Sequence, residues 1–133
     1  MIVALALAAA AASDTAQYPV LSVSELVGRE AEFHGRIVEV HGWMGECRPL
    51  GCFIHATPDG VGKRALDADH RQWLSIGPAK AGFDRKAAQL KGRQVGLRAR
   101  FDETCLDQTM ICLDRVSELR PINSHPLFAL KDH

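Results

Sequence analysis

The sequence lacks a net charge and any recognisable catalytic motif. Its 16 Lys and Arg balance 16 Asp and Glu over 133 residues, so no overall positive field attracts nucleic acid. It contains no G-x-S-x-G, no Gly-rich phosphate loop and no metalloprotease helix. We therefore expect a protein that is not an enzyme. An enzymatic role would require a carboxylate or histidine with a shifted pKa in a cleft.

Apolar runs of membrane-spanning length are also missing. The uncharged run at residues 1–12 is shorter than the roughly 18 residues that span a bilayer. Its length and Ala-rich end predict a secretory signal peptide cut after Ala12, although no Lys or Arg precedes Arg29. The alternatives are a start codon placed too late or an ordinary buried helix. Export would make the mature chain periplasmic or secreted, with no membrane span.

Cysteine is scarce, but the spacing of the four cysteines is informative. CRPLGC holds Cys47 and Cys52, and CLDQTMIC holds Cys105 and Cys112. An even number in an oxidising compartment predicts disulfides, and we favour closure of each loop on itself over a link between the two loops. A zinc site is disfavoured because the second pair is separated by more residues than structural zinc sites use. A redox pair is disfavoured because no C-x-x-C motif is present. Free thiols are the third alternative. We expect no metal and no cofactor.

Apolar periodicity and the positions of glycine and proline predict five strands and one helix. The strands are expected within 32–45, 52–56, 72–77, 93–103 and 110–122, and the helix within 81–92. Gly42 predicts a bulge or sharp bend in the first strand, and Gly92 ends the helix. Ser24 is a possible N-cap of a short helix before the first strand. The tail from Asn123 to His133 is expected to be loose.

The order strand, strand, strand, helix, strand, strand is that of a five-stranded Greek-key OB-fold barrel, an all-β fold with one short helix. The chain resembles small exported bacterial OB-fold proteins in two passages, FHGRIVEVHGWMG and LKGRQVGLRARF. The resemblance implies an OB-fold domain over 31–120, after an N-terminal tail and short helix at 13–30 and before a C-terminal tail at 121–133. It implies binding in general and carries no catalytic residue.

The OB-fold resemblance also implies where a ligand would bind. OB-folds bind on the face around the second and third strands, between two loops that here carry the cysteines. Strand alternation places six candidate ligand-binding residues on this face: His41, Trp43, Phe53, His55, Trp73 and Ser75. Such a platform could stack bases or sugar rings. The alternative is that the N-terminal segment with Val23, Leu26 and Val27 covers the rings as a second small core.

Basic residues are concentrated in residues 80–100, where Asp84 is the only acid. They are Lys80, Arg85, Lys86, Lys91, Arg93, Arg98 and Arg100. The OB-fold helix lies away from the binding face, and the loop beside that face carries Glu103 and Asp107, which repel phosphate. We therefore expect the basic stretch to be a solvated surface.

These observations predict an exported, non-enzymatic, monomeric OB-fold binding module. Its partner would be a protein, a peptide or a small ligand of the cell envelope such as a sugar. The alternative is a protein that binds single-stranded nucleic acid through Trp43, Phe53 and Trp73. The salt dependence of binding distinguishes these two hypotheses. The affinity for nucleic acid falls steeply with salt, whereas the affinity for a sugar stacked on aromatic rings does not.

Overall fold

A computed structural model describes residues 17–48, 51–58, 72–77, 79–102 and 117–131. Within these residues the strands are β1 (Val20–Ser22), β2 (Ile37–Arg48), β3 (Gly51–His55), β4 (Trp73–Ile76), β5 (Gln94–Asp102), β6 (Glu118–Pro121) and β7 (Leu127–Ala129). The helices are α2 (Val23–Gly28), α3 (Glu30–Phe33) and α4 (Phe83–Gln89). None of these helices is long and apolar enough to cross a lipid bilayer.

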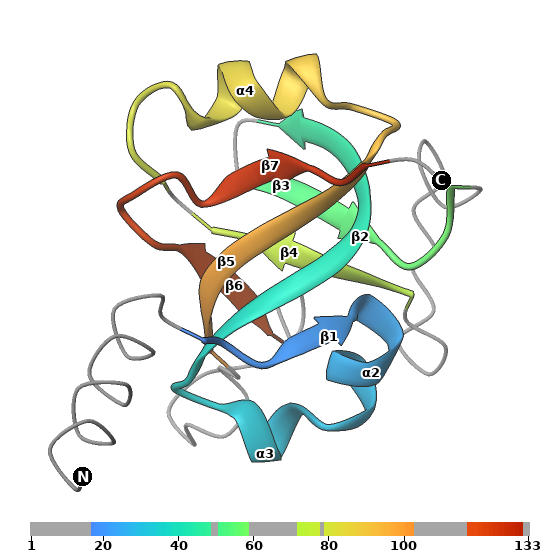
Figure 1. Cartoon of the computed structure of the whole chain (residues 1–133), viewed down its shortest axis with the longest axis vertical. Coiled ribbons are helices and arrows are strands. Elements are labelled where there is room, and N and C mark those ends of the chain that lie inside the picture. Colours follow the sequence, from blue (N-terminus) through green and yellow to red (C-terminus); the bar gives the residue numbers. More distant parts are fainter. Residues whose placement is uncertain (1–16, 49–50, 59–71, 78, 103–116, 132–133) are drawn as a thin grey trace, which may run out of the picture.

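The sheet closes into a barrel because β2 pairs with both β5 and β3. Its first part, from Ile37 to Trp43, pairs antiparallel with β5, and its second part, from Trp43 to Arg48, pairs antiparallel with β3. The strand order β2-β3-β4-β6-β5 then returns to β2, with β4 and β6 parallel (Figure 1). This connectivity is that of the OB-fold barrel and confirms the predicted fold.

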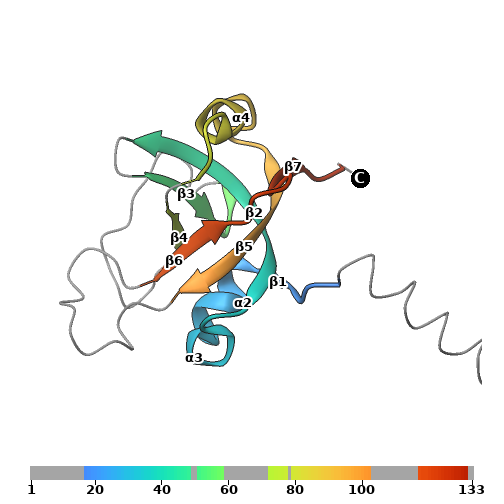
Figure 2. The same cartoon turned by 90° about the vertical axis from the view of Figure 1, so that its left-hand side faces the viewer.

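The barrel interior is filled by the apolar residues that alternate along the strands. Val38 and Val40 of β2 are completely buried, as are the predicted inward residues of β5. The helix α4 covers one end of the barrel, and its buried residues are the predicted Phe83 and Ala87 (Figure 2). The helix α2 lies at the other end and contributes Val23 to the same core. The N-terminal segment therefore joins the main core instead of forming a second one over the outward rings.

The helix α2 begins two residues earlier than predicted. Its N-cap is Ser22, whose Oγ accepts a hydrogen bond from the Glu25 backbone N–H at 3.1 Å, while the Ser22 N–H donates to Glu25 Oε1 at 2.8 Å. This reciprocal capping box satisfies two backbone groups that a helix start leaves open. The predicted N-cap, Ser24, is wrong, and its hydroxyl donates instead to the side chain of Gln72.

The irregularity of β2 lies after Gly42. Gly42 pairs regularly with Val95 of β5, and the register with β3 shifts between Met44 and Cys47. The predicted bulge at Gly42 is therefore misplaced. Gly42 is needed for close packing instead, because a Cβ there would lie 2.6 Å from the carbonyl oxygen of His55.

The sheet extends beyond the predicted barrel on both sides. The strand β1 pairs parallel with β2, and β7 pairs antiparallel with β5. The prediction of a loose tail from Asn123 is therefore wrong for β7, where Leu127 is buried. The predicted signal peptide at 1–12 and the second cysteine pair, Cys105 and Cys112, lie outside the described residues.

Candidate functional site

A row of side chains crosses the outside of the barrel over four adjacent strands. Trp43 of β2 lies opposite Gln94 of β5 on one side and opposite His55 of β3 on the other. His55 in turn lies opposite Trp73 of β4. On each strand a neighbouring residue is completely buried in the core, so this row points outward, as the alternation predicts. The register thus places a histidine between two tryptophans.

A second pair lies beside this row. Phe53 is opposite Ser75, and the Phe53 ring meets the Trp73 ring edge to face, with centroids 5.5 Å apart and an interplanar angle of 86°. Such pairs contribute about 0.5–1.5 kcal/mol beyond the area they bury. All these side chains except that of His55 are half-buried. We name the following group the aromatic face: Trp43, Phe53, His55, Trp73 and Ser75.

His55 is not the exposed contact that the sequence predicts. Its exposed fraction is 3%, although it lies on the outward side of β3. The ring lies against Gly45, where a Cβ would be 2.6 Å from His55 Nε2, and Gly45 falls where β2 bulges. Burial lowers the pKa of His55, and the nearby charge of Glu46 only partly opposes this. His55 is therefore an uncharged floor of the aromatic face at neutral pH.

His41 lies two residues before Trp43 but belongs to another cluster. Its Nε2 is 2.7 Å from Glu39 Oε2, and the Arg98 Nε–H donates to Glu39 Oε1 at 3.0 Å. Arg98 also lies over the Phe128 ring, 4.9 Å from its centroid, and that ring packs on Gly96. We name Glu39, His41, Arg98 and Phe128 the charged face. The structure groups the other five predicted ligand-binding residues and holds His41 apart from them by its bond to Glu39.

The two carboxylate interactions of the charged face explain the acidity of Glu39. Partial burial alone would raise its pKa, but the hydrogen bonds from His41 and Arg98 outweigh burial and lower it. Glu39 is therefore charged at neutral pH, and its partners hold it in place. Its shifted pKa follows from ion pairing across two strands and requires no cleft.

The first cysteine pair forms the predicted disulfide. Cys47 and Cys52 lie opposite each other in the β2–β3 hairpin, with Cα atoms 3.9 Å apart and a bond between their sulfurs. Asp84 Oδ1 of α4 lies 3.7 Å from Cys52 Sγ. In the described part of the chain, these three residues are the group whose donor atoms approach closely enough for a metal ion. The sulfurs are already bonded to each other, so the group fits a disulfide.

An acidic border next to Ser75 was missed by the sequence analysis. Glu118 of β6 lies opposite Ser75 and is 5% exposed, and a Cβ at Gly77 would be 2.5 Å from its Cδ. The Arg120 Nε–H donates to Glu118 Oε2 at 3.1 Å, and Arg120 also pairs with Asp102. The alternation of Glu118, Leu119 and Arg120 was the available signal for an outward carboxylate at this position.

No protein-family model matches the sequence, and no curated protein matches it. A solved structure described as "OBody AM3L09 bound to hen egg-white lysozyme" is similar, with 16% identity, a TM-score of 0.47, and coverage of 77% of this chain and 88% of that chain. Another, "OBody AM3L15 bound to hen egg-white lysozyme", has 13% identity, the same TM-score, and coverage of 77% and 87%. Lysozyme binding is a property of those two chains.

Proposed function

We propose that this protein is an exported, non-enzymatic binding module that holds its ligand on the aromatic face. The observation that carries the proposal is the half-buried state of Trp43, Phe53 and Trp73, which leaves part of each ring in contact with water. OB-fold barrels bind on this side, over the strands that correspond to β3 and β4. A ligand ring that covers such an aromatic side chain gains about 1–3 kcal/mol.

The charges around the aromatic face favour a ligand without phosphate. Glu46 is close enough to act on the pKa of His55, and Glu118 lies opposite Ser75. The Glu46 carboxylate disfavours a phosphate backbone there, whereas Glu118 is buried and paired with Arg120. A sugar of the cell envelope suits the face best, because its C–H surface stacks on aromatic rings and its hydroxyls can bond to Ser75. A peptide or protein segment is the second ligand class, and single-stranded nucleic acid is the third.

The absence of catalysis is inferred from the surroundings of Glu39 and His55, the two partly buried groups in the described part of the chain whose pKa is shifted. His55 has a lowered pKa but is almost completely covered, so a substrate proton could not reach it. The pKa of Glu39 is lowered because Glu39 is paired with His41 and Arg98. Structural ion pairs commonly shift a pKa in this way. Neither group has the access that a general acid or base needs.

Export is supported by the disulfide of the β2–β3 hairpin. Such bonds persist in oxidising compartments and are rare in the cytosol. The intact mass of the protein purified from its own cells tests this part directly. We expect a mass that lacks residues through about Ala12 and that rises on reduction. An uncut chain with free thiols would refute export.

The binding proposal can be tested by tryptophan emission. The chain has two tryptophans, Trp43 and Trp73, and both belong to the aromatic face, so the emission reports on this site alone. We would titrate the protein with peptidoglycan fragments, with triacetylchitotriose and with oligothymidylate, at low and at high NaCl. Saturable binding of a glycan that is insensitive to salt is expected. Binding of oligothymidylate that weakens steeply with salt would identify nucleic acid, and not a sugar, as the ligand.

A variant pair makes the binding test specific. Trp73→Ala removes one stacking ring and should weaken glycan binding by roughly tenfold or more. Phe128→Leu removes an outward ring from the charged face and serves as the matched control, with unchanged affinity expected. Circular dichroism would verify that both variants fold. An equal loss in both variants would overturn the assignment to the aromatic face, and saturation by none of the three probes would exclude a glycan and nucleic acid as the ligand.

A further inference from the structure

A cavity lies at the α4 end of the molecule, between the segment that leads into α4 and the turn that joins β6 to β7. Its volume is about 630 Å³, within the range of small-molecule sites. It shares no residue with the aromatic face, so it does not depend on the function proposed above. The predicted solvated surface at residues 80–100 contributes Lys80 and Lys86 to its lining.

The floor of the cavity is apolar. Phe83 of α4 and Leu127 of β7 are both core residues, and both line the cavity. Ile122 also lines it, from the end of β6. A bare ion would gain nothing from such a floor, whereas a hydrocarbon chain would leave water by covering it. The floor therefore favours a ligand with an apolar body.

The rim of the cavity is cationic. Lys80 and Lys86 line it on the α4 side and His125 on the β6–β7 turn, and the described lining contains no Asp or Glu. The nearest acid in sequence, Asp84, approaches Cys52 Sγ and is not part of the lining. His125 is also the non-glycine residue of the described chain with a positive φ, 46°. Such unfavourable backbone conformations concentrate at ligand sites.

We propose that this cavity binds a small amphipathic anion, a carboxylate attached to an apolar chain. The carboxylate lies between the two lysines and His125, and the chain lies over Phe83 and Leu127. Charge complementarity selects the anion because the described lining holds two ammonium groups and no Asp or Glu. The apolar floor selects a fatty-acid-like ligand over inorganic phosphate.

The test uses the full chain, labelled with ¹⁵N, and octanoate below its micelle concentration. We expect saturable shifts of the Gly82, Ser124 and Leu127 amide signals. Octan-1-ol, which has the same chain without the charge, should bind at least about tenfold more weakly, because a charge-assisted hydrogen bond is lost. Inorganic phosphate should not saturate these shifts. Equal binding of octanol, or equal binding of phosphate, would overturn the proposal.

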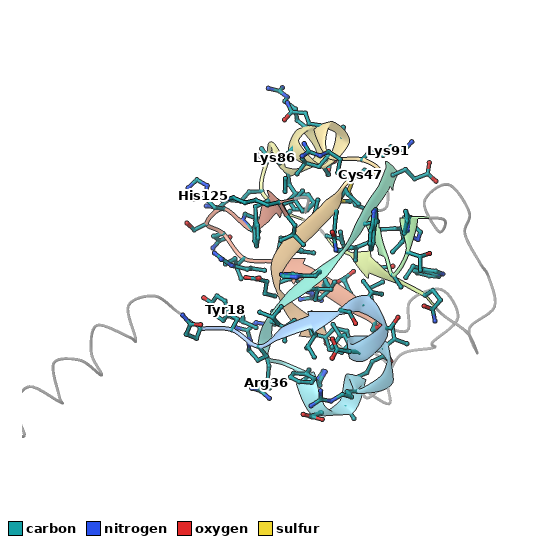
Figure 3. The ribbon with its side chains drawn as sticks, turned by 45° about the vertical axis from the view of Figure 1, so that its right-hand side comes forward. Tyr18, Arg36, Cys47, Lys86, Lys91 and His125 are labelled. Carbon is teal, nitrogen blue, oxygen red and sulfur yellow. A yellow bond between two sulfur atoms is a disulfide. The ribbon has the colours of Figure 1, made fainter. Side chains whose placement is uncertain are left out.

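Three charge variants locate the site. Lys86→Gln and His125→Asn should each weaken octanoate binding by about 3- to 10-fold, because each removes one donor to the carboxylate. Asn is chosen at position 125 because it tolerates a positive φ. Lys91→Gln removes the same charge from beyond the end of α4, outside the cavity, and should leave affinity unchanged (Figure 3). An equal loss in Lys91→Gln would show general charge attraction and refute the site.

Discussion

The aromatic face and the charged face lie side by side on β2, yet they are built differently. In each face a ring packs against a glycine. His55 packs against Gly45 in the aromatic face, and Phe128 packs against Gly96 in the charged face. The charged face supplies partners to its own groups, since Arg98 contacts both Glu39 and the Phe128 ring. In the aromatic face Phe53 meets Trp73 edge to face, and Trp43 lies two strands from Trp73 in the same row. The charged face is held by ion pairs between strands, whereas the aromatic face gathers partly exposed rings on one surface, and such a surface can take a ligand.

The largest expected difference between the faces concerns their two glycines. Gly45→Ala should destabilise the fold by about 3 kcal/mol, because the new Cβ meets a buried ring and the Phe53 carbonyl oxygen. Gly96→Ala should cost about 1 kcal/mol, because Phe128 lies on a three-residue strand and can lift away. Urea unfolding of both variants gives the two free energies. Equal losses would show that both rings are held equally tightly.

The disulfide stabilises the β2–β3 hairpin of the aromatic face, whereas the pairing of β2 with β5 is non-covalent. Cys47→Ala combined with Cys52→Ala should lower the free energy of unfolding by about 2 kcal/mol, the chain-entropy contribution of a short loop. Reductant should destabilise the wild type by at least as much. The double variant isolates this bond from any that Cys105 and Cys112 form. An unchanged free energy of unfolding in the double variant would contradict the prediction.

His55 should make stability depend on pH, with a smaller effect than the disulfide. Burial holds its folded pKa below the unfolded value near 6.5, so the unfolded chain binds the proton more readily. Its contribution to stability is complete above that unfolded pKa and is lost as the pH falls through the folded pKa. Urea unfolding between pH 4 and 8 should show this loss in the wild type and a reduced loss in His55→Gln. An undiminished loss in His55→Gln would contradict this assignment.

The smallest effect is expected for the ion pairs of the charged face. Glu39→Gln weakens the bonds to His41 and Arg98 and should cost about 0.5–1 kcal/mol, because the Arg98 side chain is 41% exposed to solvent. The loss should shrink at high NaCl, which screens the pair in the wild type. Glu32→Gln breaks a more exposed pair with Arg29 and should change stability by less than Glu39→Gln does. A larger loss in Glu32→Gln would contradict the ranking of the pairs.

Local patterns predicted most of the barrel correctly. The alternation around Val38 and Val40 and the helical spacing of Phe83 and Ala87 assign these side chains to the core, where the structure places them. Period-2 and period-3.6 patterns reflect the geometry of a single element, so they can be read without knowing its neighbours. The pairing of Cys47 with Cys52 was predictable for the same reason, because a tight hairpin brings close residues together.

Contacts between distant segments decided the strand β7 and the cavity, whereas the Ser22 cap follows from a local signal. The strand β7 carries a weak pattern and is ordered by pairing with β5. The Ser22 cap is distinguished from Ser24 by the position of Glu25, a local signal that the sequence analysis overlooked. The cavity at the α4 end forms because the turn after β6 meets the segment before α4. The spacing of these two segments in the sequence does not predict this contact.

The sequence by itself determined which side chains point inward and which point outward on each strand, because alternation is a property of the extended backbone. Only the tertiary structure decided which outward groups are covered. His55 is buried because a bulge in β2 brings Gly45 beneath its ring. His41 is held by Glu39, whose second partner, Arg98, lies 59 residues further along the chain. Whether an outward side chain is buried depends on how separate strands approach each other. A periodic pattern within one strand holds no information about that approach.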